Sequence, residues 1–257
     1  MHGDLQVSDL GAPSEVHGVH GAAGLTRWRS LAAGRALRGP YEAVEWACVP
    51  PGGISGEHRH TRTEEMYILL TGEGEALLNG APHPVRAGEL ILTGLGATHA
   101  LSNTGSVDLS WLTLEVPAQH TTSTAHAALA GREGEENMPV PPPGTTAVVS
   151  LDEQGDIDPR PVLVGPLRRV RRVAVAPETE EKFSGAGMEH SVFVRSGAGV
   201  AVCGGSRVPV RADMAVTTSL GENLVVRAGA EGLDLICATF VVDDAAGGGP
   251  AGTGEAR

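Results

Sequence analysis

The chain has 257 residues and a formal net charge of −12, so it can form one large domain or two of ordinary size. This acidity argues against nucleic acid, whose binders usually present a basic face, and against docking on anionic lipid. No apolar run approaches the length of a membrane span, and residues 1–24 hold no apolar core of signal-peptide length. The three cysteines form no CxxC pair, which favours a reduced protein. We therefore expect a cytoplasmic chain without nucleic-acid or membrane partners.

In chain order, the first region is of mixed composition. Residues 1–40 are interpreted as an N-terminal arm, and the stretch 23–40 is predicted as a short helix or an irregular segment. Over residues 41–117, β-forming side chains alternate with Gly and Pro turns, which predicts one strand after another. The expected strands and hairpins cover residues 41–50, 65–80, 88–94 and 107–117.

The middle and the end of the chain have the composition of connecting segments. Residues 118–147 combine small polar side chains, a charge cluster and a proline run, which predicts a linker. Strand character resumes over residues 148–242. Residues 243–257 hold too few apolar side chains to pack, so we expect a disordered tail.

The two strand-rich regions contain related sequences. The segment EEMYILLTGEGEALLNGAPHPVRAGELILTGLG begins at Glu64, and EHSVFVRSGAGVAVCGGSRVPVRADMAVTTSLG begins at Glu189. They align without a gap at a fixed offset of 125 residues, and PVRAGELILT matches PVRADMAVTT almost position by position. Because this period has the size of a domain, it predicts a tandem pair of β-rich domains rather than a solenoid.

One short stretch, GEHRHTRTEEMYILL, carries the residue types of a metal site. Residues two apart in a strand point the same way, so His58 and His60 present two imidazoles side by side. The same alternation groups Glu65 with Tyr67 and turns Glu64 to the opposite face. Two imidazoles need a third and a fourth group to hold a divalent ion.

His99 follows a Gly-rich turn farther along the chain and supplies the fourth candidate. A single His-x-His is more often solvated than ligating, and a lone histidine such as His99 is more often a half-buried polar residue. The joint pattern of three histidines and Glu65, on β segments that both end in glycine turns, favours a metal site.

These two segments resemble the two motifs of the cupin superfamily, G-x5-H-x-H-x(3,4)-E-x6-G and G-x5-P-x-G-x2-H-x3-N. Gly94 stands where the second motif usually has proline, and this departure removes no ligand. Counting six residues between the glutamate and the closing glycine selects Glu65 rather than Glu64. The matching residues are Gly52, His58, His60, Glu65 and Gly72 in the first motif, and Gly88, Gly96, His99 and Asn103 in the second.

The resemblance implies an all-β fold of two tandem double-stranded β-helix, or jelly-roll, barrels. The metal-binding barrel spans residues 41–117 and a degenerate second barrel spans residues 148–242, so one metal per chain is expected. His190 is the single imidazole left in the second copy, and we interpret it as a satisfied core or surface residue. The resemblance also favours a homodimer. The second-copy counterparts of the four ligands are Phe183, Gly185, His190 and Leu224.

The strand that carries Glu65 is apolar on its other face as well. Met66, Ile68 and Leu70 occupy that face, whereas a strand facing water would alternate with polar residues. We therefore expect this face to be covered, either by the second barrel or by another subunit.

Three imidazoles and one carboxylate suit Fe(II), Mn(II), Ni(II), Zn(II) or Cu(II), and the resemblance favours Fe(II). In octahedral geometry four protein ligands leave two positions for substrate and water, or for substrate and O2. Candidate pocket residues are Trp46, Tyr67, Trp111, Asn103 and Arg62, with Tyr67 also a candidate catalytic group. Core packing of the aromatic residues and a solvated Arg62 are the structural alternatives.

The histidines of VHGVH, His17 and His20, are interpreted as part of a mobile polar loop rather than as a second metal site.

Three functions remain open for a chain of this kind. The first is a non-heme Fe(II) oxygenase acting on a small organic molecule. The second is a non-redox metal-dependent isomerase, decarboxylase, lyase or cyclase. The third is a small-molecule binding protein without catalysis.

Overall fold

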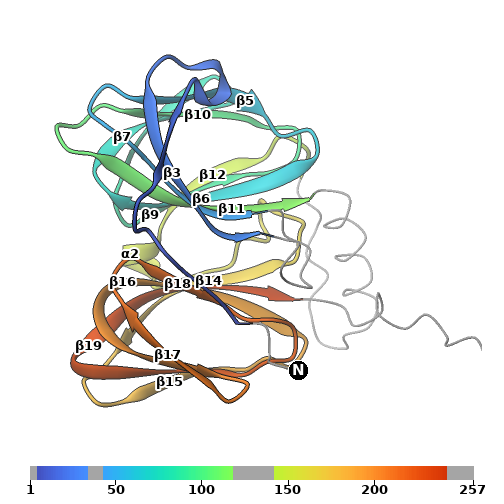
Figure 1. Cartoon of the computed structure of the whole chain (residues 1–257). Helices are drawn as coiled ribbons and strands as arrows, with labels where there is room; N and C mark the ends of the chain where they lie inside the picture. The colour runs from blue at the N-terminus through green and yellow to red at the C-terminus, as the bar shows by residue number, and fades with distance from the viewer. Residues whose placement is uncertain (1–4, 34–42, 118–141, 242–257) are drawn as a thin grey trace, which may run out of the picture.

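The computed structural model describes residues 5–33, 43–117 and 142–241 and forms two β-barrels, one above the other in Figure 1. The expected all-β fold class is confirmed. In the described part of the chain the only helices are α2 (Leu151–Gln154) and the 3-10 turn η1 (Val19–Gly21). None of the described helices is long and apolar enough to cross a membrane. Most of the expected linker and the whole expected tail lie outside the described residues.

The N-terminal barrel consists of two sheets that enclose an apolar cluster. The seven-stranded sheet has the order β12-β9-β6-β11-β4-β3-β2 and the four-stranded sheet has the order β5-β10-β7-β8. Buried side chains such as Leu69, Leu101 and Trp111 fill the space between the sheets. The strands are β2 (Ser14–His17), β3 (Leu25–Ala33), β4 (Ala43–Val49), β5 (Ile54–Arg59), β6 (Thr63–Thr71), β7 (Glu73–Leu78), β8 (Ala81–Arg86), β9 (Glu89–Thr93), β10 (Thr98–Asn103), β11 (Leu109–Pro117) and β12 (Thr146–Ser150).

The C-terminal barrel is a single eight-stranded sheet wrapped around its own cluster, which includes Phe183, Leu224 and Leu235. Its long strands β16 and β19 pair with each other over most of their length and bend at two register shifts. The strands are β1 (Gln6–Asp9), β13 (Asp156–Ile157), β14 (Leu167–Val175), β15 (Glu180–Phe183), β16 (Met188–Cys203), β17 (Ser206–Arg211), β18 (Met214–Thr217) and β19 (Leu224–Val241).

Each barrel includes one strand from outside the stretch that the sequence predicted for it. β1, at the N-terminus, pairs with β18 of the C-terminal barrel, and β12 pairs with β9 of the N-terminal barrel. Our sequence-based boundary at residue 148 therefore falls inside a strand of the first barrel. The expectation of a short helix or irregular segment was wrong for residues 25–33, because they form β3 between β2 and β4.

The largest apolar cluster lies between the two barrels. Met66 and Ile68 from β6 belong to one buried cluster with Phe193 and Ile236 from the C-terminal barrel, and Leu70 packs against its edge. The prediction that the Met66 face of β6 is covered is confirmed, and the covering surface is the second barrel. Because burying apolar side chains is favourable, this cluster contributes to holding the two barrels together.

Candidate metal centre

Three neighbouring elements of the N-terminal barrel bring the four predicted ligands together. β10 pairs with β5 so that His99 lies opposite His58, while β6 supplies Glu65 from the facing sheet. His60 follows β5, and its backbone is fixed by hydrogen bonds with Ala97 and Gly96 at 2.9 and 2.7 Å. Gly96 has a φ of 87°, a left-handed conformation that suits glycine in the turn before His99.

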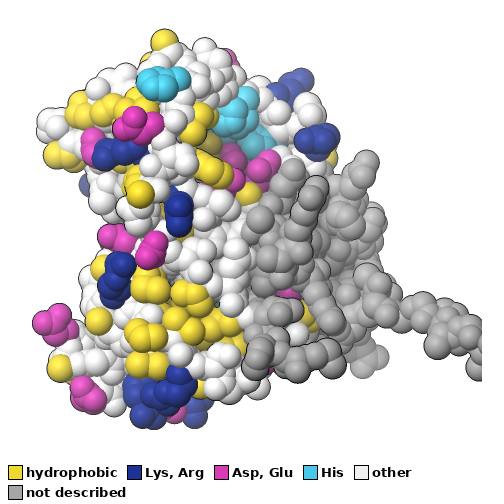
Figure 2. All heavy atoms as spheres, in the orientation of Figure 1, with side chains coloured by type: hydrophobic (Ala, Val, Ile, Leu, Met, Phe, Trp, Pro, Cys, Tyr) yellow, Lys and Arg dark blue, Asp and Glu magenta, His cyan; other side chains and the backbone are white. Residues whose placement is uncertain are grey.

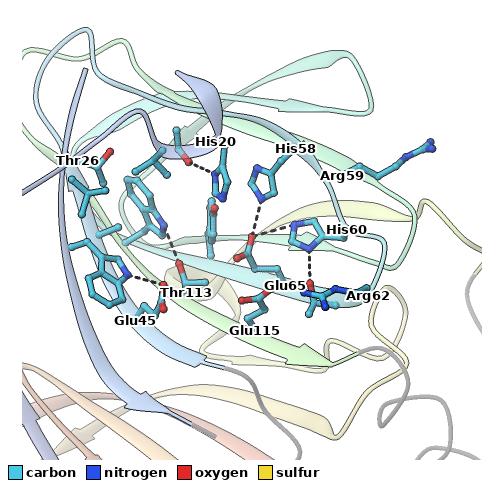
Figure 3. A pocket seen from close by; sticks show the side chains of 18 of the residues that line it. His20, Thr26, Glu45, His58, Arg59, His60, Arg62, Glu65, Thr113 and Glu115 are labelled. Atoms are coloured by element: carbon cyan, nitrogen blue, oxygen red, sulfur yellow. Dashed lines mark hydrogen bonds and ion pairs between the residues drawn. The ribbon is translucent and has the colours of Figure 1, made fainter. Parts of the chain in front are cut away.

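The ligand atoms of these four residues converge on one point at the barrel wall, and Figure 3 shows His58, His60 and Glu65 of this group. One atom from each of His58, His60, Glu65 and His99 lies within 4.8 Å of the others. The Nε2 atom of His99 is 3.1 Å from that of His60 and 3.0 Å from that of His58. Glu65 Oε2 is 2.9 Å from His99 Nε2, 3.3 Å from His60 Nε2 and 4.0 Å from His58 Nε2.

The other nitrogen of each ring is held by an oxygen, which orients the imidazoles. His58 Nδ1 donates to the Gly56 carbonyl at 3.0 Å, so its neutral ring carries a lone pair on Nε2. The Nδ1 atoms of His60 and His99 lie 3.2 and 3.0 Å from the Thr63 and Thr93 hydroxyl oxygens, which can accept in the same way. Burial lowers the pKa of His58 to about 4, so this ring is neutral at pH 7. Three lone pairs therefore point at one place, as they do in metal sites.

The Glu65 carboxylate completes the test of whether a cation fits. Among the described residues no donor meets hydrogen-bond geometry at the buried Oε2 atom. A buried anionic oxygen surrounded by nitrogen lone pairs is stable only with a cation between them. The four residues present thus fit one divalent metal ion.

A cavity of about 430 Å³ opens beside this group and reaches the surface of the N-terminal barrel. In the view of Figure 2, histidine and acidic side chains lie next to each other on that barrel. Tyr67 and Trp111 form part of the wall, with ring centroids 5.4 Å apart, and Tyr67 lies 4.8 Å from the His99 ring. Arg62 also lines the cavity, whereas Arg59 extends away from the imidazoles (Figure 3).

Two of the predicted pocket residues lie elsewhere. Trp46 faces the interface between the barrels, where it lines a cleft with Leu70 and Phe193. Asn103 is buried and holds a turn, because its side-chain amide donates to the Val49 and Val107 carbonyls at 3.0 and 2.8 Å. Neither side chain lines the cavity beside the metal ligands.

The structure adds cavity residues that the sequence reasoning missed. Glu45 and Glu115 lie on strands β4 and β11, and Trp28 Nε1 donates to Glu45 Oε2 at 2.8 Å. Burial raises the pKa of Glu45, and the hydrogen bond from Trp28 opposes this rise. His20 reaches the cavity from the loop between β2 and β3. Alternation along β4 would have found Glu45 if the register of β4 against β11 had been known.

The C-terminal barrel has no equivalent centre. His190 takes the place of Glu65, and its ring nitrogens lie 3.1 Å from Thr239 Oγ1 and 2.7 Å from the Ser184 carbonyl oxygen. This matches the expectation of a satisfied core residue. Over the described ranges, no second group of histidine, cysteine or acidic side chains gathers as potential metal ligands.

Gly94, the departure from the usual proline, has a structural reason. Its N–H donates to the Thr145 carbonyl at 2.9 Å, a bond that proline cannot make. A Cβ at this position would lie 2.8 Å from the Val162 carbonyl oxygen and 3.0 Å from that of Thr145. The segment that leads into β12 and the connection between β13 and β14 both pass close to this glycine.

Comparisons with known proteins agree with this architecture. The family model described as Cupin domain matches residues 45–115. An oxalate-binding protein of Thermotoga maritima is 31% identical over 100 residues, which cover 39% of this chain and 83% of that protein.

Two solved structures share the fold over most of the chain. Oxalate decarboxylase of Bacillus subtilis, described with Mn(II) centres, has a TM-score of 0.64 at 16% identity and covers 93% of this chain and 77% of its own. Salicylate 1,2-dioxygenase of Pseudoaminobacter salicylatoxidans has a TM-score of 0.61 at 16% identity and covers 93% of this chain and 83% of its own.

Proposed function

The chain belongs to the cupin superfamily, and on that premise we propose that it is a metal-dependent enzyme acting on a small organic molecule. One observation carries the proposal. Three imidazole lone pairs and the buried Glu65 carboxylate converge at the wall of a cavity of about 430 Å³. A cavity of this size fits a small molecule and places it against the metal ligands.

A divalent transition metal held by His58, His60, Glu65 and His99 would supply a Lewis acid, or with Fe(II) a redox centre that activates O2. The chain's own residues provide the surroundings. Burial, followed by the charge of Glu65, raises the pKa of Tyr67 well above its usual value, so its hydroxyl stays protonated at neutral pH. It can therefore donate a hydrogen bond to a substrate oxygen. Trp111 provides an apolar wall that excludes water on one side.

We favour Fe(II)-dependent oxygenation as the reaction. The ligand set suits Fe(II), and the same two-barrel fold supports a dioxygenase in salicylate 1,2-dioxygenase, although likeness at this identity concerns the fold alone. The test is oxygen uptake by protein reconstituted anaerobically with Fe(II), over a panel of small hydroxylated aromatic and carboxylic acids. Consumption of O2 with one member of the panel supports oxygenation. Undiminished turnover under strict anaerobiosis contradicts it.

A non-redox reaction, such as decarboxylation, isomerisation or elimination, is the second candidate. The acidic side chains of Glu45 and Glu115 favour it, because carboxyl groups in a cavity can take up or deliver a proton. Arg62 on the same cavity suits an anionic substrate. The relative at 31% identity is an oxalate-binding protein, so oxalate and related dicarboxylates belong in the panel. Turnover with Zn(II) or Mn(II) in the absence of O2 identifies this class. A ligand that binds but returns unchanged with every metal instead identifies a binding protein.

A further inference from the structure

The loop between β2 and β3 folds over the metal-binding strand of its own barrel. This loop forms η1, which contacts β5. The contact is close at Gly56, where an added Cβ would meet the His20 carbonyl oxygen at 2.2 Å. A glycine in the interior of a strand often marks such a close approach of another backbone. The loop therefore rests on the bare backbone two residues before His58.

His20 extends from this loop onto the ring of His58 (Figure 3). The two ring centroids are 3.6 Å apart and the rings are inclined by 24°, which is a stacked arrangement. His20 Nδ1 lies 3.3 Å from the hydroxyl of the buried Ser55, which fixes the outer ring from a second side. His20 itself remains exposed, so its remaining surface faces solvent.

The backbone of His20 supports the view that this side chain is held in place. It adopts φ 50° and ψ 35°, a left-handed conformation that is unfavourable for any L-residue. Glycine would avoid this cost. The contacts of the imidazole with His58 and Ser55 provide a compensating interaction that glycine lacks.

His58 is the member of the metal group that most needs such support. Its side chain is 21% exposed, against 3% for His60 and 2% for His99. The other two rings are enclosed by the barrel and face threonine hydroxyls, whereas the Nδ1 atom of the more exposed His58 bonds to the Gly56 carbonyl. His20 lies against one face of the His58 ring and limits its rotation.

We propose that His20 is a positioning residue that holds the His58 imidazole in its metal-binding orientation and caps the outer side of the centre. This inference rests on the proposed metal-dependent function, and it assigns a role to a residue outside the ligand set. Residues that orient a metal ligand typically change affinity by about 10–100-fold when they are removed.

The experiment measures Co(II) affinity and the visible absorption spectrum of bound Co(II) in the full chain. The variants are His20→Ala, His20→Phe and His17→Ala. His17 is the matched control, because it is an exposed histidine at the end of β2, three residues before His20. His20→Ala removes the stacked ring, whereas His20→Phe keeps a ring against His58. We expect His20→Ala to weaken Co(II) binding about tenfold and to alter the spectrum, with His17→Ala unchanged and His20→Phe close to wild type.

Gly56→Ala is a second way to displace the loop, since the new Cβ cannot coexist with the His20 carbonyl at 2.2 Å. It should reproduce the effect of His20→Ala on affinity, and thermal unfolding of the metal-free variants shows whether the fold is intact. Unchanged affinity and spectrum in His20→Ala would overturn the inference while leaving the metal centre standing. Failure of the wild-type protein to bind Co(II) would overturn both the metal centre and the role of His20. Loss of affinity in His17→Ala would also overturn the role of His20, because the effect would then belong to the whole β2–β3 hairpin.

Discussion

Glu64 and Glu65 are adjacent on β6, yet their carboxylates serve opposite sides of the sheet. Glu65 Oε2 lies 2.9 Å from His99 Nε2 inside the N-terminal barrel. Glu64 turns toward the C-terminal half and accepts the N–H groups of Val164 and Gly165 at 3.0–3.2 Å. Strand β6 thus contributes one carboxylate to the metal centre and the next one to the segment around Val164 and Gly165.

Replacing Glu65 should abolish tight metal binding. Glu65→Gln removes the only negative charge of the ligand group, so we expect the affinity for Mn(II) or Fe(II) to fall by more than about 100-fold, beyond the range for supporting residues. Metal content after dialysis and titration calorimetry measure the change. Glu64→Gln is the matched control and should retain the metal. Equal losses in both variants would contradict the assignment of Glu65 as the ligand.

Replacing Glu64 should reduce stability instead of metal binding. Glu64→Ala leaves the buried N–H groups of Val164 and Gly165 without their acceptor, and each unpaired group costs about 1–3 kcal/mol. Urea unfolding of the metal-free protein should show this loss. Glu64→Gln keeps one acceptor oxygen and should lose less than Glu64→Ala. A fully stable Glu64→Ala variant would argue against this connection.

Opening the interface between the barrels should destabilise the chain without disturbing the metal. Phe193 is 4% exposed and belongs to the cluster that contains Met66 and Ile68. Phe193→Ala should lower the free energy of unfolding by about 3–5 kcal/mol. Because this cluster lies on the face of β6 opposite Glu65, the metal affinity of the folded variant should match that of wild type. Denaturant unfolding and calorimetry test the two parts separately.

Restoring the proline of the usual motif at residue 94 should be harmful. Gly94→Pro removes the bond to the Thr145 carbonyl and adds atoms where two carbonyl oxygens already approach. The lost hydrogen bond alone should lower stability by about 1–3 kcal/mol. Gly94→Ala keeps the N–H and separates the steric part from the hydrogen-bond part. A thermal midpoint at or above wild type in Gly94→Pro would show that the segments of Thr145 and Val162 do not pass so close.

Glu45 should make the folded protein less stable as the pH rises. Burial raises its pKa, Trp28 opposes that shift, and nearby Glu65 adds to it. Since the folded-state pKa lies above the unfolded value, ionisation as the pH passes through the folded pKa takes stability away. The unfolding free energy of metal-free Glu45→Gln, relative to wild type, should therefore rise as the pH increases above about 4. A difference that does not change with pH would contradict the raised pKa.

The metal ligands could be predicted from the sequence because their pattern is local. His58 and His60 are two apart, Glu65 follows on the next strand, and a glycine turn precedes His99. Strand alternation also separated Glu65 from Glu64 correctly. Trp46 was placed in the pocket because alternation alone does not say which face of a strand points inward. Its pairing with Leu112 turns it to the interface, while Glu45, paired with Thr113, faces the cavity.

Contacts between distant segments lay beyond sequence reasoning. His20 was interpreted as part of a polar loop, since nothing in VHGVH indicates that η1 rests on Gly56. Residues 25–33 contain Ala, Leu and Arg, which are good helix formers, yet they form β3 because β2 and β4 supply partners on both sides. Tertiary pairing decided the structure in both places.

The pairing of β1 and β12 with strands far away in the sequence has a consequence for how the protein is made. Gln6 pairs with Thr217, so β1 is synthesised long before its partner β18. The N-terminal barrel likewise lacks its edge strand β12 until residues 146–150 have been translated. The C-terminal barrel thus needs a strand made long before it, and the N-terminal barrel needs residues up to 150. A gene cut at residue 117 would encode an N-terminal barrel without β12, and the remainder would encode a C-terminal barrel without β1.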